Sequence, residues 1–100
     1  MMPAVVLMSR EVLPENEQEA VQLMRELRIK AMHQPGYLMG ETLSSLRKRG
    51  KNMVISKWRT VEDFEAWRQN AERQQLEARL GSLLATPAVE EVYVEAPTTV

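Results

Sequence analysis

Histidine is the side chain best suited to acid–base chemistry at neutral pH, because its ordinary pKa is about 6.5. The chain has one, His33, which is a possible general base. It stands just before Pro35 and Gly36, at the expected end of a helix, where an imidazole can instead interact with the last helical carbonyls. The second role is favoured, because the spacing gives His33 no acid–base partner.

Trp67 is the strongest candidate for contact with a ligand. It follows Phe64 by three residues, so the two rings share one face of a helix. Such a ring either lines a pocket or anchors the core, and the sequence leaves both roles open. Trp58 is expected to pack at the sheet or at a dimer seam. The polar residues that could reach a cleft are Ser9, Arg10, Asn70, Arg73 and Tyr93. Each of these also has an ordinary surface or packing role.

Composition excludes several kinds of chemistry and of partner. The chain has no cysteine, which removes disulfides, thiolate nucleophiles, iron–sulfur clusters and cysteine-type zinc sites. Its 100 residues, 44% hydrophobic and 27% charged, are expected to form one globular domain over residues 1–100. The net charge of -1 gives no reason to expect nucleic acid or an anionic membrane as a partner. With no signal peptide and no long apolar span, we expect a soluble protein of the cytoplasm.

Hydrophobic patterning predicts four strands. They are expected at residues 4–8, 37–43, 53–58 and 89–95. Ser9 and Arg10 are the first polar positions after the opening apolar run, so the first strand should end there. Apolar side chains occur on both sides of the strands, which implies that both faces of the sheet are covered.

Two helices are expected between these strands. The first would begin at Asn16, whose spacing to Glu19 is that of a capping box. The second would begin after Thr60, which is suited to an N-cap position. Its early and late apolar stripes differ in phase, so we expect a bend or a break near residues 70–75.

The resulting order, βαββαβ, is that of the ferredoxin-like split fold in the α+β class. It has a four-stranded antiparallel sheet with two helices on one face. The other face would still carry Val, Leu, Met and Ile side chains, and a soluble monomer rarely leaves such a patch bare. We therefore expect a homodimer that pairs through the open sheet face.

The stretch 53–67 combines a strand, a capped helix start and both tryptophans. It contains W-R-T-x-x-x-F-x-x-W, an order that resembles the antibiotic biosynthesis monooxygenase family of dimeric α+β barrels. The resemblance implies a dimer and a cofactor-independent monooxygenase, which oxidises a small phenol or quinol with O2 in a cleft between helices and sheet. It also gives Trp67 the role of a pocket wall for this small aromatic ligand. The alternative is a non-catalytic module of the same fold that binds a small molecule or protects a quinone.

Two other functions share this topology, and particular residues argue against each. The haem-degrading branch of the family combines a first-strand Asn and the helix Trp with a haem-ligating His ten residues after that Trp. Here Glu77 stands ten residues after Trp67, and Ser9 is nearest to the first-strand position. We therefore expect no haem and no other cofactor. RNA-binding domains of this topology stack bases on aromatics of the first and third strands, which have none at the required positions.

Overall fold

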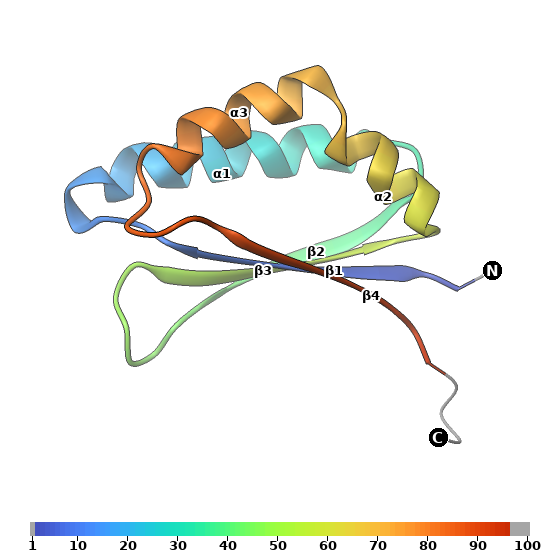
Figure 1. Cartoon of the computed structure of the whole chain (residues 1–100), viewed down its shortest axis with the longest axis horizontal. Helices are drawn as coiled ribbons and strands as arrows, with labels where there is room; N and C mark the ends of the chain where they lie inside the picture. The colour runs from blue at the N-terminus through green and yellow to red at the C-terminus, as the bar shows by residue number, and fades with distance from the viewer. Residues whose placement is uncertain (1, 97–100) are drawn as a thin grey trace.

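The structure, a computed structural model, describes residues 2–96 and places four strands in one sheet (Figure 1). The strands are β1 (Ala4–Glu11), β2 (Tyr37–Ser44), β3 (Lys51–Trp58) and β4 (Val89–Val94). Their order across the sheet is β2-β3-β1-β4, so β1 and β3 are central. Each neighbouring pair is antiparallel. The predicted ferredoxin-like α+β fold is confirmed. The polar tail after residue 96 lies outside the described residues.

The helices lie together on one face of the sheet (Figure 1). They are α1 (Glu17–Met32), which follows a 3-10 turn at Pro14–Asn16, then α2 (Val61–Arg68) and α3 (Ala71–Gly81). The apolar stripe of α1 packs into the core through Ala20, Leu23, Leu27 and Ala31. Within residues 2–96, no helix has both the length and the apolar character needed to cross a membrane.

The second predicted helix is divided into α2 and α3, with the break at residues 69–70. Asn70 caps α3, because its Oδ1 accepts a hydrogen bond from the Arg73 N–H at 3.1 Å. Thr60 caps α2 in the same way, accepting from the Asp63 N–H at 3.0 Å. Two separately capped helices can differ in direction. Trp67 and Arg73 are therefore both buried, although the apolar stripes of the two segments differ in phase.

The first strand is longer than the sequence suggested. Ser9 and Arg10 do not end β1, because its pairing with β3 continues to Glu11 opposite Lys51. Buried and half-buried positions alternate along β1, and the buried set ends with Arg10, which is 6% exposed. The predicted strand end was wrong, because cross-strand pairing outweighs local polarity.

The predicted capping box at the start of α1 was also wrong. Asn16 occupies the N-cap position, but its side chain makes no capping hydrogen bond. Instead, its Nδ2 donates to the Leu83 carbonyl oxygen at 3.3 Å. The amide therefore ties the start of α1 to the segment after α3, a contact between residues that are distant in the sequence.

The face of the sheet opposite the helices carries apolar side chains from all four strands, with the charged residues Glu41, Lys57 and Glu91 among them. Its central strands contribute half-buried side chains, namely Val5, Leu7, Met53 and Ile55. Its edge strands contribute side chains that are 45–58% exposed, namely Met39, Leu43, Val89 and Tyr93. No element within residues 2–96 covers this face, which we call the open face.

Replacing Thr60 with alanine should lower the free energy of unfolding by about 1 kcal/mol, because the Asp63 N–H loses its acceptor. Urea denaturation at a fixed protein concentration measures the change. Thr60→Ser keeps the hydroxyl and should retain most of the stability. Equal losses in the two variants would assign the effect to the methyl group of Thr60 rather than to the cap.

Candidate functional site

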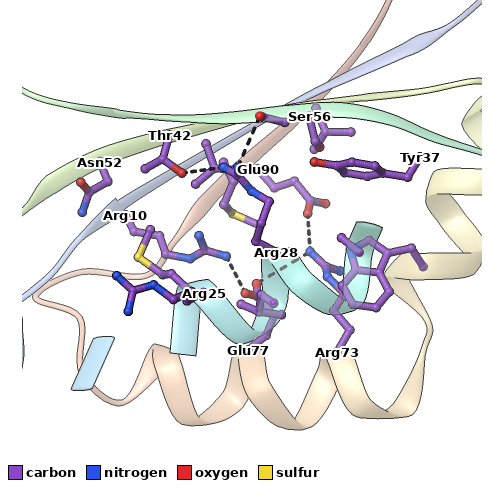
Figure 2. A pocket seen from close by; sticks show the side chains of 18 of the residues that line it. Arg10, Arg25, Arg28, Tyr37, Thr42, Asn52, Ser56, Arg73, Glu77 and Glu90 are labelled. Carbon is purple, nitrogen blue, oxygen red and sulfur yellow. Dashed lines mark hydrogen bonds and ion pairs between the residues drawn. The ribbon is translucent and has the colours of Figure 1, made fainter. Parts of the chain in front are cut away.

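A cavity of about 420 Å³ lies between the helical layer and the sheet (Figure 2). All three helices and all four strands contribute to its lining. Exposed lining residues occur where α1 faces the edge strand β2, among them Arg25, Thr42 and Ser44. The cavity therefore opens along that edge, and its volume is in the usual range for a small-molecule site.

One end of the cavity is aromatic. Trp58, Phe64 and Trp67 line it and are 1%, 2% and 6% exposed. The Trp58 ring meets Tyr37 and Phe64 edge to face, with centroid separations of 5.3 and 5.9 Å. Its Nε1 donates to the Ser56 hydroxyl at 3.1 Å, so the polar atom of this buried ring is satisfied. These contacts fix Trp58 on the helix side of the sheet, and not at a seam on the open face.

The sheet floor of the cavity becomes more polar with distance from Trp58. Successive rows on the helix side are Gly40–Ser56–Val6, Thr42–Val54–Met8 and Ser44–Asn52–Arg10. At roughly 3.3 Å per residue, the last row lies about 20 Å along β3 from Trp58. The cavity thus has an aromatic end and a polar end.

Ion pairs join the sheet to α3 beside the cavity (Figure 2). Arg10 of β1 pairs with Glu77, whose other carboxylate oxygen lies 3.7 Å from Arg73. Arg73 in turn pairs with Glu90 of β4 at 3.1 Å. Arg73 also lies 5.8 Å from the centroid of the Phe64 ring, so a guanidinium borders the aromatic end.

Two further arginines on α1 line the cavity. Arg28 is half-buried and donates to the Gly40 carbonyl oxygen at 3.4 Å and to the Thr42 hydroxyl at 2.8 Å. Arg25 is exposed, and Figure 2 shows no bond from it to the other residues drawn. Within residues 2–96 neither side chain has a carboxylate partner.

The structure brings three of the predicted site residues together at the cavity, namely Arg10, Trp67 and Arg73. Asn70 is not among its lining residues, because its side chain caps α3. His33 also lies outside the lining. It is exposed at the end of α1, where its Nδ1 lies 2.8 Å from the Ile29 carbonyl oxygen. This is the helix-end interaction that the sequence favoured.

Ser9 and Tyr93 lie on the open face, on the opposite side of the sheet from the cavity. Tyr93 pairs with Val5 in the register of β1 and β4. Its hydroxyl donates to the Glu91 carboxylate at 2.6 Å, and this bond, together with the negative charge, raises the pKa of Tyr93. Strand alternation explains the placement, because Arg10 and not Ser9 shares the parity of the buried β1 positions.

Several lining residues were not predicted as site residues, although each carried a weak signal. Arg28 follows Met24 by four positions and so lies near it on one face of α1. Glu77 follows Arg73 by one helical turn. Glu90 faces the helices opposite Met8, which only the register of β4 reveals. No single sequence signal links these side chains across the fold.

A second cavity lies behind the Arg10–Glu77 pair and is otherwise lined by residues between 81 and 88. Both side chains line both cavities, so this ion pair stands between them.

Glu77 also occupies the position at which the haem-degrading branch of the family has its haem-ligating His, and Arg10 pairs with its carboxylate. In the described part of the chain, no group of three or more His, Cys, Asp or Glu side chains could hold a metal ion.

These features define a ferredoxin-like α+β protein with a ligand-sized cavity beneath its helices. Residues 3–79 match the family Antibiotic biosynthesis monooxygenase, and the chain belongs to that family. The resemblance carried by the stretch 53–67 is thereby confirmed. No curated protein sequence matches the chain.

Several solved structures are similar to the whole fold. A conserved protein from Methanosarcina mazei has a TM-score of 0.87 at 16% identity, covering 93% of this chain and 92% of that chain. A protein from Mycobacterium tuberculosis has a TM-score of 0.86 at 15% identity, covering 98% and 99%. A variant of SnoaB, a cofactor-independent oxygenase from Streptomyces nogalater, has a TM-score of 0.85 at 14% identity, covering 96% and 95%. Structural similarity at such low sequence identity establishes a shared fold and nothing further.

Replacing Glu77 with alanine should destabilise the protein more than replacing Glu90 with alanine. Loss of Glu77 leaves Arg10 buried without a carboxylate, which costs about 3 kcal/mol. Arg73 keeps Glu77 when Glu90 is removed, so Glu90→Ala should cost about 1 kcal/mol. Urea denaturation of both variants checks the order, and a larger loss for Glu90→Ala would contradict it.

Proposed function

We propose that the chain is a cofactor-independent monooxygenase that oxidises a small phenol- or quinol-type substrate with O2 in the cavity between helices and sheet. The observation that carries the proposal is the aromatic end of the cavity, formed by Trp58, Phe64 and Trp67 in a member of this family. Trp67 would be a wall for the substrate ring. The similarity to SnoaB, itself a cofactor-independent oxygenase, supports the same activity.

The reaction needs no reductant other than its substrate. When a phenol becomes a quinone, one atom of O2 enters the ring, the other leaves as water, and the substrate supplies all four electrons. The steps would be loss of the phenolic proton to solvent water at the open edge of the cavity, electron donation to O2, and collapse to the oxygenated product with release of water. The apolar wall would keep water from the reacting pair.

A second candidate is a non-catalytic module that binds a small aromatic molecule or protects a quinone. One observation favours it: Glu77 and Glu90, the carboxylates that line the cavity, are both engaged by arginines. His33 lies outside the lining, so it offers no base there. Such a module would bind its ligand and release it unchanged in air.

We also propose that two chains pair through the open face. Its central apolar side chains are half-buried and its edge apolar side chains are about half exposed, so a second copy would bury these side chains further. The cavity opens on the other side of the sheet and would stay accessible in this dimer.

Wild-type protein should raise oxygen uptake with at least one compound from a panel of hydroquinones, naphthols and anthrones. Trp67→Ala should lower kcat/KM by about 10- to 100-fold, because the aromatic ring of the substrate loses the wall that orients it. Trp67→Phe should lose less. An oxygen electrode measures uptake, and label from ¹⁸O₂ in the product separates oxygenation from release of hydrogen peroxide.

Leu46→Ala serves as the control for these variants, because Leu46 is 99% exposed and is not among the residues that line the cavity. Circular dichroism would confirm that each variant is folded. Flat oxygen traces for wild type, together with quenching of tryptophan fluorescence by a ligand that is recovered unchanged, would contradict the oxygenase and support the binding module.

Ile55→Lys should convert the dimer to a monomer, because it places a charge in the centre of the open face without a partner. Analytical ultracentrifugation at micromolar concentration measures the mass. Ile29→Lys is the matched control, since Ile29 is 52% exposed on α1, and it should leave the dimer intact. A monomer mass for the wild-type chain would contradict the proposed pairing.

A further inference from the structure

We infer that Arg25 and Arg28, on the α1 wall of the cavity, form an anion-binding subsite that selects aromatic substrates carrying a carboxylate. The inference rests on the proposed function for the place of the ligand in this cavity, and does not require that the ligand be turned over.

The cavity concentrates positive charge that the chain as a whole does not have. Four arginines and two glutamates line it, which leaves a formal surplus of two positive charges, whereas the whole chain has a net charge of -1. Arg10 and Arg73 are paired with those glutamates. The surplus therefore resides on Arg25 and Arg28. Apolar walls strengthen the field that such charges exert on a bound ligand.

Neutral groups hold Arg28 in place. Its side chain reaches from α1 toward the sheet, where the Gly40 carbonyl oxygen and the Thr42 hydroxyl accept its hydrogen bonds (Figure 2). These bonds orient the guanidinium without neutralising its charge, and they leave further N–H donors unused. A guanidinium with free donors binds a carboxylate through two parallel hydrogen bonds.

The absence of a side chain at Gly40 lets the Tyr37 hydroxyl, a second donor, lie against the same part of the wall. A Cβ at this position would stand 2.3 Å from the Tyr37 hydroxyl and 3.5 Å from Arg28 Nε. The Tyr37 hydroxyl and the guanidinium therefore both border Gly40, and any larger residue there would displace the Tyr37 ring. The Tyr37 hydroxyl would then lie near an anion bound by Arg28 and could donate a neutral hydrogen bond to it.

The distance between Arg28 and the aromatic end suits a single small ligand. Gly40 and Thr42, which hold Arg28, lie in the rows of Ser56 and Val54, two and four residues from Trp58 along β3. Arg28 therefore meets the sheet roughly 7–13 Å from Trp58. The cavity volume of about 420 Å³ is enough for a small aromatic molecule that reaches both. A carboxylate at Arg28 would direct the rings toward Trp67.

The test compares a hydroxynaphthoic acid with its methyl ester, which has the same rings and no charge. Quenching of tryptophan fluorescence under argon gives both dissociation constants without turnover. The acid should bind about 10- to 100-fold more tightly, as charge-assisted hydrogen bonds predict, and high salt should reduce the preference. Equal affinities would overturn the inference. Tighter binding of naphthyl phosphate than of the acid would overturn the assignment to carboxylates.

Variants then identify the residues that recognise the charge. Arg28→Gln should weaken binding of the acid far more than binding of the ester and so remove most of the preference, and Arg25→Gln should remove a smaller part. Arg79→Gln is the matched control, because Arg79 is exposed on α3 and does not line the cavity. Equal weakening of acid and ester by Arg28→Gln would overturn the inference, since it would mean that Arg28 only shapes the cavity.

Oxygen uptake separates this inference from the proposed function. Selective binding of the acid without uptake would retain the subsite and contradict the oxygenase. Uptake at equal kcat/KM for acid and ester would retain the oxygenase and overturn the subsite.

Discussion

The buried charge of Arg10 is the constraint on which the site depends. Alternation along β1 turns this guanidinium toward the helices, where it is 6% exposed and requires a carboxylate. Glu77 of α3 supplies it, and Arg73 and Glu90 extend the network to β4. Charged groups therefore occupy the interface between sheet and α3 where apolar side chains would otherwise close it, and the cavity lies beside them.

The division of the second helix gives the cavity its two kinds of wall. An uninterrupted helix would keep one phase and could not bury both Trp67 and Arg73 well. The cap supplied by Asn70 starts a new helix, so α2 presents aromatic rings and α3 presents charged groups to the same space. Arginines of α1 line the same space. One cavity can thus hold an apolar ring system and an anionic group together.

Strand alternation separates the two surfaces of the sheet by function. The helix side carries the cavity, and the open face carries the apolar residues suited to pairing with a second chain. A shift of one position in any strand would exchange these roles, which is why Ser9 and Arg10, adjacent in sequence, lie on opposite sides. Access to the cavity from the edge of β2 is independent of what covers the open face.

Local sequence signals determined the elements of this protein. Alternating and helical spacing gave the order βαββαβ, and Thr60 with Phe64 and Trp67 gave the start and inner face of α2, because caps and periodicity are set by neighbouring residues. Tertiary structure decided the site. The bond from Asn16 to the Leu83 carbonyl and the ion pair of Arg10 with Glu77 each join residues 67 positions apart. Such pairings follow from the register and packing of the whole fold, which no local pattern encodes.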